Sequence, residues 1–340
     1  MRAAWKKFRY RLEWLALKTV ATVIPLLSRQ ACYRLGQSIG SLAAKFDRRN
    51  RRVALSNLEA AFGDALSPAR RSEIARESYQ HFARTVIDLF WSPSLTSRNY
   101  SRYIDVENLK LVEEEMKAGH AIIFACFHYS NFEWVAVAAN FFGIESALIA
   151  QEFKNPLLDE IFVGLRQSSG QRVIPREGGV LRLFKTLQRG GRVAILTDLT
   201  IPAQLPTVAI DCFGLKTSVT FAHAWAHRRA GATVINVHCE PIPGGRYRIV
   251  FHPLVEFPPE ASLQEMAQAC WDQFEPFVRQ NPSPWLWMYK HWRYRPLDAD
   301  PATYPFYANI SQDFERRLDE RARHLPPMTS TVMLPPGVIP

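Results

Sequence analysis

Short apolar runs alternate with longer amphipathic stretches between residues 100 and 280 of this 340-residue chain. Apolar runs of a few residues are typical of buried strands, and apolar residues repeated every three or four positions are typical of helices. The expected strands are 121–127, 146–151, 172–174, 192–197, 208–212, 233–239 and 247–252. Because helical stretches separate most of these runs, the pattern predicts an α/β fold with a mixed, mostly parallel central sheet flanked by helices.

The first 90 residues show helical spacing and no strand pattern. Residues 31–44 and 53–62 are expected to be helices, and Ser67-Pro68 is expected to begin a helix that ends near Phe90. The predicted parts are a basic, amphipathic helical region that associates with membranes (1–60), a main domain (61–296) and a Pro-rich, partly disordered extension with one amphipathic segment at 310–323 (297–340).

The N-terminal 30 residues combine basic residues with the apolar stretch Trp14–Leu27, which Lys18 and Pro25 interrupt. This stretch is shorter than the roughly 20 residues that a membrane span needs. The pattern therefore favours a helix lying in the membrane interface over a removed signal peptide. A single tilted span and a helix packed on the domain itself stay open as alternatives. Basic residues before the apolar stretch place the N-terminus on the cytoplasmic side.

The net charge of +10 indicates an anionic partner. Large apolar residues are interleaved with the basic ones, which favours a membrane surface over nucleic acid. The block from Trp285 to Arg295 mixes aromatic and basic residues that could stack bases, but packing and interfacial anchoring are the better interpretation.

Cysteine and histidine spacing indicates neither a disulfide scaffold nor a metal. The five cysteines are scattered, odd in number and form no CxxC pair, which fits a reducing compartment. His223 and His227 stand four positions apart on an expected helix, but no third ligand is apparent, so no metal is expected. No P-loop, dinucleotide fingerprint or GxSxG elbow is present, so nucleotide hydrolysis and the usual serine hydrolase chemistry are not expected, nor is any cofactor.

The chain places its candidate chemistry where the apolar run Ala121–Phe127 ends in His128 and a helix is expected to begin. In open α/β sheets, ligands bind at the carboxyl ends of the strands. If His128 lies on the loop, Glu133 in the first helical turn can reach back to one ring nitrogen and leave the other free as a general base. Ser130 and Glu133 also match a capping box, which would engage the carboxylate with backbone amides instead.

The segment His128-Tyr-Ser-Asn-Phe-Glu133 resembles the HX4(D/E) motif of the glycerolipid and lysophospholipid acyltransferase superfamily. Within it, the chain is similar to the lipid A biosynthesis (late) acyltransferases and the related phosphatidylinositol mannoside acyltransferases from about residue 51 to residue 296. The blocks that carry this resemblance are RRVALSNLEAAFGD, NPLLDEIFVGLR, LQRGGRVAILTD, FGLKTSVTFAHAWAHRRAGATVI and PSPWLWMYKHWRYRP.

The resemblance implies a membrane-bound acyltransferase at the cytoplasmic face of the inner membrane. Such an enzyme moves an acyl chain from an acyl carrier protein or coenzyme A thioester to a glycolipid hydroxyl, for example of a lipid A precursor. His128 would deprotonate the hydroxyl and Glu133 would orient His128. A thioester hydrolase, a non-catalytic lipid-binding protein and an acyltransferase for another acceptor, such as a mannolipid, a lysophospholipid or a secondary metabolite, stay open.

Four further residues are expected to bind substrate. In the family, an arginine matching Arg166 is functional and a basic residue near Arg176 lies close to the site; an Arg fork suits phosphate or an oxyanion. Asp198 ends the run VAILTD and would share the sheet edge of His128 if the two strands are parallel. The family has Gln or His after this Asp, whereas this chain has Leu199. Asn131, inside the motif, completes the set.

Overall fold

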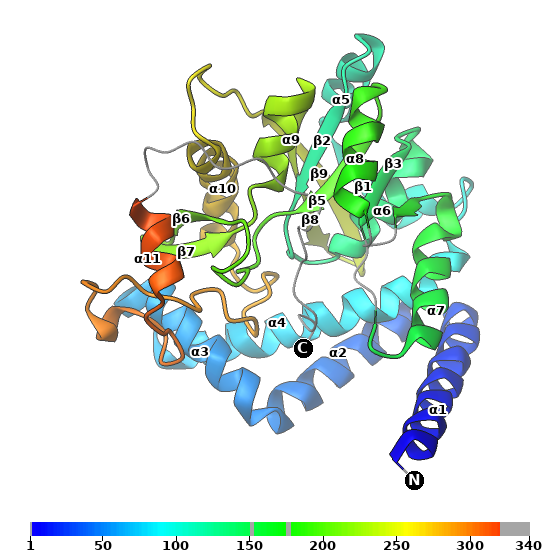
Figure 1. Ribbon diagram of the computed structural model, residues 1–340. Coiled ribbons are helices and arrows are strands. Elements are labelled where there is room, and N and C mark those ends of the chain that lie inside the picture. Colours follow the sequence, from blue (N-terminus) through cyan, green and yellow to red (C-terminus); the bar gives the residue numbers. More distant parts are fainter. Residues whose placement is uncertain (1, 150–152, 175–177, 320–340) are drawn as a thin grey trace.

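A computed structural model describes residues 2–149, 153–174 and 178–319 (Figure 1). Within this part of the chain, seven strands form one sheet in the order β1-β9-β8-β2-β5-β3-β4. The strands are β1 (Ile104–Glu107), β2 (Ile122–Cys126), β3 (Ser146–Ile149), β4 (Arg172–Ile174), β5 (Arg192–Leu196), β8 (Thr233–Ile242) and β9 (Arg246–Leu254). Every neighbouring pair is parallel except β8 and β9, so the predicted mostly parallel α/β fold is confirmed.

Two strands lie outside this sheet. β6 (Val208–Cys212) and β7 (Leu215–Val219) form a separate antiparallel hairpin. The sequence pattern predicted β6 but neither β7 nor β1. Both missed strands are short, and polar residues interrupt their apolar ones, so they lack the continuous apolar run that marks the strands of the sheet interior.

Helices flank the sheet and also form a layer beneath it in the view of Figure 1. They are α1 (Arg2–Val23), α2 (Arg29–Phe46), α3 (Arg48–Phe62), α4 (Pro68–Trp91), α5 (Leu109–Lys117), α6 (Phe132–Ala139), α7 (Pro156–Arg166), α8 (Gly179–Gln188), α9 (Ala222–Ala230), α10 (Leu263–Gln280) and α11 (Gln312–Asp319). The start of α4 is the predicted one: Ser67 caps the helix by accepting from the amide of Arg70, and Pro68 occupies the first turn.

The N-terminal helices are joined to the main domain by close packing. α2 lies directly on α4, because Gly36 and Gly40 carry no side chain at the contact; a Cβ at Gly40 would collide with the backbone of Gln80. α1 lies beside α7, where the Tyr10 hydroxyl donates to the Lys154 carbonyl at 2.8 Å. Among the described residues, no helix combines the length and apolar character that crossing a membrane requires.

The described part of the C-terminal extension packs on the main domain instead of standing apart. Phe314 of α11 is fully buried and stacks on Tyr294. The amide of Asn309 donates to the Arg293 carbonyl, and the amide of Arg295 donates back to the Asn309 carbonyl. Within the amphipathic segment predicted at 310–323, the structure shows a helix from Gln312 to Asp319. Residues 320–340 lie outside the described part.

Candidate active site

His128 lies just after the carboxyl end of β2, on the short loop that leads into α6. The helix cap at this corner is Asn131, whose side-chain oxygen accepts from the amide of Trp134 at 3.1 Å. The alternative capping box of Ser130 and Glu133 does not form. Ser130 instead has φ of +49°, and its backbone is held on both sides, by the carbonyl of Pro284 and the hydroxyl of Thr85. A non-glycine residue in this conformation costs about 1–3 kcal/mol, so the corner is held under strain.

Asp198 is the carboxylate that holds His128. Its Oδ1 lies 2.8 Å from Nδ1 of His128, and its Oδ2 accepts from the His128 amide at 3.0 Å. The side chain of Asp198 is fully buried, and that of His128 is 12% exposed. Because a carboxylate only accepts, Nδ1 carries a hydrogen, and in the neutral imidazole Nε2 then keeps its lone pair. Nε2 has no hydrogen-bond partner among the described residues.

The prediction that Asp198 shares the sheet edge of His128 is confirmed by strand pairing. β2 and β5 are adjacent and parallel, with Cys126 opposite Leu196, so the residues two positions on from each emerge side by side. Burial by itself would raise the pKa of Asp198, but the charge and hydrogen bonds of His128, with that of Trp285, outweigh it and lower this pKa. Asp198 is therefore ionised, and its side chain is buried behind the imidazole; its expected contact with substrate stays a prediction.

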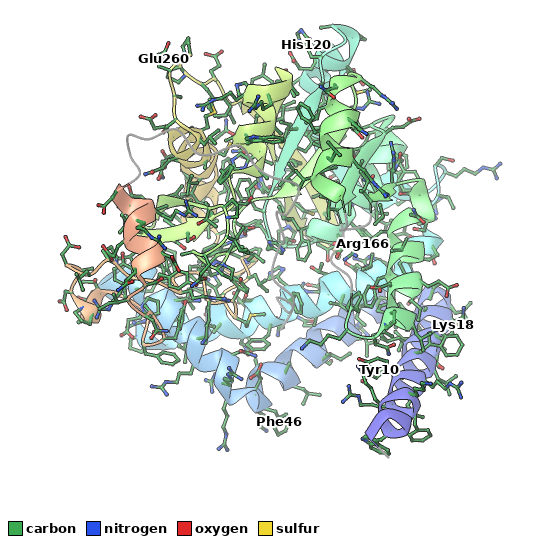
Figure 2. All side chains as sticks on the ribbon, in the orientation of Figure 1. Tyr10, Lys18, Phe46, His120, Arg166 and Glu260 are labelled. Atoms are coloured by element: carbon green, nitrogen blue, oxygen red, sulfur yellow. The ribbon has the colours of Figure 1, made fainter. Side chains whose placement is uncertain are left out.

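The expected partnership of Glu133 with His128 is wrong in this structure. Glu133 accepts two hydrogen bonds from Arg166, from Nε at 2.9 Å and from Nη2 at 2.7 Å (Arg166 is labelled in Figure 2). Burial would lower the pKa of Arg166, but the Glu133 charge and hydrogen bond raise it, so the pair is ionic. The sequence motif thus contributes to two separate pairs, His128 with Asp198 and Arg166 with Glu133.

Asn131 has a structural part at this corner, and its expected contact with substrate stays a prediction. It is fully buried, and its amide donates to Oδ2 of Asp88 at 2.9 Å. The same buried carboxylate of Asp88 pairs with Arg29 of α2 and accepts from the hydroxyl of Tyr247 of β9 at 2.6 Å. Asp88 therefore ties α2, α4, α6 and β9 together directly behind the corner that carries His128. No sequence pattern marked Asp88, Arg29 or Tyr247, because each partner comes from a distant part of the chain.

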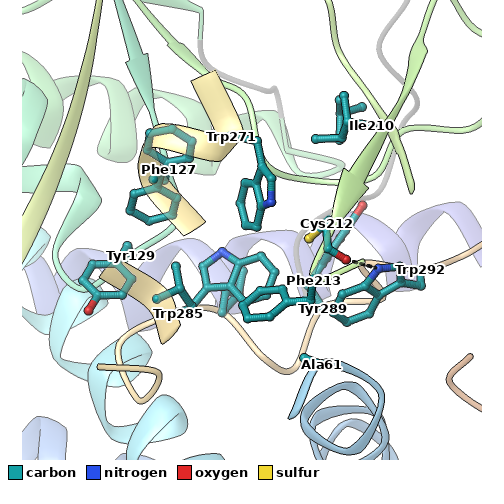
Figure 3. Packing of buried hydrophobic residues seen from close by; sticks show 14 of the residues in the cluster. Ala61, Phe127, Tyr129, Ile210, Cys212, Phe213, Trp271, Trp285, Tyr289 and Trp292 are labelled. Carbon is teal, nitrogen blue, oxygen red and sulfur yellow. Dashed lines mark hydrogen bonds between the residues drawn. The ribbon is translucent and has the colours of Figure 1, made fainter. Parts of the chain in front are cut away.

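Trp285 also supports His128 through Asp198, whereas the sequence had assigned its block to packing and interfacial anchoring. Its indole Nε1 donates to Oδ2 of Asp198 at 2.9 Å, and its ring stacks on His291 with the centroids 3.9 Å apart. Burial lowers the pKa of His291 to about 4, so that imidazole is neutral. Figure 3 shows Trp285 in the middle of the buried aromatic cluster, between Tyr129 and Phe213. The packing interpretation of this block is confirmed, but its fully buried tryptophans do not anchor the protein in an interface.

The cleft beside His128 is narrow. Its volume is about 10 Å³, which is room for about one water molecule or one hydroxyl group. It is lined by Ser78, Phe82, His128, Ser130, Phe132, Pro284 and Leu286. His128 thus borders a small, mostly apolar opening.

His223 and His227 do not join this site. Arg176 lies outside the described residues. His223 is buried and has no hydrogen-bond partner among the residues that the structure describes, and burial lowers its pKa to about 4. Nδ1 of His227 lies 2.8 Å from the carbonyl of Ala232. Within the described ranges, no three His, Cys, Asp or Glu side chains are grouped so as to hold a metal ion.

Comparison with known proteins identifies the family of this chain. The profile of the bacterial lipid A biosynthesis acyltransferases matches residues 2–294. The chain belongs to this family. It is 23% identical to the lipid A biosynthesis lauroyltransferase of Escherichia coli K12 over 87% of this chain and 95% of that protein. It is 22% identical to the palmitoleoyltransferase of the same organism over 85% of this chain and 93% of that protein.

A second group of relatives is named for a different acceptor. The phosphatidylinositol mannoside acyltransferase of Mycobacterium tuberculosis H37Rv is 25% identical over 64% of this chain and 68% of that protein. Membership of the family makes the present chain an acyltransferase.

Proposed function

We propose that this acyltransferase moves a fatty acyl chain from a thioester donor to a hydroxyl group of a glycolipid, with His128 as general base. The observation that carries the proposal is the pairing of His128 Nδ1 with the buried, ionised Asp198, which leaves Nε2 as the acceptor at the cleft. A base of this kind contributes roughly 10²–10⁴-fold to the rate.

Each residue then has a defined part in the reaction. Nε2 of His128 takes the proton from the lipid hydroxyl as its oxygen attacks the thioester carbonyl carbon. The carbon–sulfur bond of the tetrahedral intermediate then breaks, and the departing sulfur takes the proton from His128, so the ester and a free thiol result without a covalent enzyme intermediate. Asp198 holds the ring in place and stabilises the transient imidazolium.

Arg166 is proposed to bind a phosphate group of the substrates. Only Nε and Nη2 of Arg166 donate to Glu133, so Nη1 is left for a substrate oxygen. In this arrangement Glu133 acts by holding the guanidinium, not the imidazole. The part of Arg176 as a second phosphate contact stays a prediction.

The acceptor is proposed to be a lipid A precursor, because the two Escherichia coli relatives that match most of this chain are named for lipid A biosynthesis. The donor is proposed to be an acyl carrier protein or coenzyme A thioester. A carrier protein is acidic, and the basic surface of this chain would attract it.

Membrane association at the cytoplasmic face is proposed to be peripheral, through α1 and α2. One side of α1 exposes Trp5, Phe8, Leu12 and Leu15, and one side of α2 exposes Ile39, Leu42 and Phe46. Basic residues of both helices and of the start of α3 lie close in sequence to these apolar ones, as expected of helices that lie in an anionic membrane surface.

The test is an assay with a labelled acyl thioester, with and without a lipid A precursor in mixed micelles. The wild type is expected to form acylated lipid only when the acceptor is present, and His128→Ala is expected to lose that product while His120→Ala, an exposed histidine, keeps it. Release of free fatty acid at the same rate without the acceptor would show a hydrolase instead. Equal activity of His128→Ala and the wild type would refute the mechanism.

A further inference from the structure

A second cavity lies at the end of the sheet opposite His128. Its volume is about 630 Å³, within the range of nucleotide-sized ligand sites. It lies at the amino ends of β3, β4 and β5 and is bordered by α8. β5 runs from Arg192 at this cavity towards Asp198 at the catalytic corner, so its five residues separate the two by roughly 17 Å. A ligand in this cavity therefore does not touch the reacting atoms at His128.

The wall of this cavity is strongly basic. Five of its lining residues are cationic and one, Glu145, is acidic. The cations are Arg172, Arg182, Lys185, Arg189 and Arg192. None of the five forms an ion pair with a described residue; Arg192 donates instead to the main-chain oxygen of Glu145 at 2.8 Å. Like charges held close together repel one another, and a bound polyanion would remove that repulsion.

Helix stabilisation does not explain this arrangement. Lys185 and Arg189 lie at the carboxyl end of α8, where cations favour the helix dipole. Arg182, however, lies in the first half of α8, nearer the end where a cation is unfavourable, and Arg172 and Arg192 begin two strands. Three separate elements thus bring their cations to one hollow.

We infer that this cavity binds a water-soluble anion that carries at least two phosphate groups, such as a nucleoside di- or triphosphate. Several phosphates are needed because the cations line a broad hollow and outnumber the single carboxylate. A dissolved ligand fits better than a lipid because the cavity lies at the end of the strands where Figure 2 places His120, whereas Phe46 of the apolar α2 side is at the opposite end of the molecule. The site is separate from the catalytic one, and its test does not depend on the acyl transfer proposed above.

The experiment measures binding by calorimetry with the full chain in detergent micelles. The probes are inorganic tripolyphosphate, adenosine diphosphate and adenosine triphosphate. The variant is Arg182→Gln/Lys185→Gln/Arg189→Gln, and the control is Arg102→Gln/Lys110→Gln/Lys117→Gln, which removes the same charge from exposed residues without an ion pair in the described structure. Thermal unfolding confirms that both variants are folded.

The wild type and the control are expected to bind the probes with similar affinity, and the cavity variant is expected to bind about 100-fold more weakly, because charge-assisted hydrogen bonds are among the strongest. Tighter binding of the adenosine probes than of tripolyphosphate would support a nucleotide ligand, and equal binding would support recognition of the phosphates alone. An equal loss in the control variant, or no binding of any of the three probes, would overturn the inference.

Discussion

The exchange of Asp198 for Asn tests the catalytic corner most directly, because it changes charge without changing size. Oδ2 of Asp198 accepts from two fixed donors, the His128 amide at 3.0 Å and the Trp285 indole at 2.9 Å. The side-chain oxygen of Asn is expected to take that position. Its NH2 group then faces Nδ1 of His128 in place of Oδ1.

The consequence is a change of tautomer. An NH2 group donates to Nδ1, so the ring hydrogen moves to Nε2, which can no longer accept a proton from the substrate hydroxyl. We expect kcat to fall by about 10²–10⁴-fold, the size of a general-base contribution, with little change in KM. Nitrogen NMR of labelled histidine would show the hydrogen on Nδ1 in the wild type and on Nε2 in the variant.

The same variant has a second signature in its stability. Because the folded pKa of Asp198 is lowered, its ionised form stabilises the native state above the unfolded pKa of about 3.9. This stabilisation is lost as the pH falls through the folded pKa. The unfolding free energy of Asp198→Asn is expected to depend less on pH below about 4 than that of the wild type. A folded variant whose kcat stays within a factor of three of the wild type would refute the tautomer argument.

Three further predictions concern the surroundings of this corner. Glu133→Gln leaves the Arg166 charge without its partner and should cost about 1–3 kcal/mol in urea unfolding, whereas Glu133→Gln/Arg166→Met should recover most of that loss; an equal loss in both would contradict an ionic pair. Ser130→Gly should change stability by less than about 1 kcal/mol and Ser130→Val should cost about 2 kcal/mol, because only the first tolerates a positive φ; equal melting temperatures would refute the strain. Asp88→Asn should lower the unfolding free energy by about 3–5 kcal/mol, since it leaves a buried arginine charge unpaired, and a loss below 1 kcal/mol would show that the network is unimportant.

The fold was largely predictable because most strands of the main sheet contain a short apolar run, and β2 is apolar along its whole length. β2 was expected at 121–127 and is found at Ile122–Cys126, with all five residues buried. The sequence did not show that β6 and β7 pair with each other outside the main sheet. Both strands are short, and β7 has polar residues among its apolar ones, so its sequence does not reveal which strand it pairs with. Periodicity reports local burial and says little about which strands pair across a long separation.

The sequence predicted where the candidate site lies, but it did not predict which side chains pair there. The carboxyl edge of β2 and the position of Asp198 beside it followed from the parallel arrangement of two apolar runs. The sequence did not show which carboxylate pairs with His128. Glu133 is five residues from His128 in the sequence, whereas Asp198 is seventy residues away. The short distance in sequence favoured Glu133, but the structure pairs His128 with Asp198.

The geometry of the corner explains why the nearer carboxylate is not the partner. Asn131 caps α6, so the helix begins only after the loop has turned away from β2, and Glu133 in its first turn reaches the Arg166 end of α7. His128, still on the strand side of the turn, faces the end of β5 and meets Asp198. Ser130, with its positive φ, lies in the loop between His128 and α6, and its amide and carbonyl are held by Pro284 and Thr85. The two ends of the motif therefore have different partners: His128 pairs with Asp198, as the proposed proton transfer requires, and Glu133 pairs with Arg166.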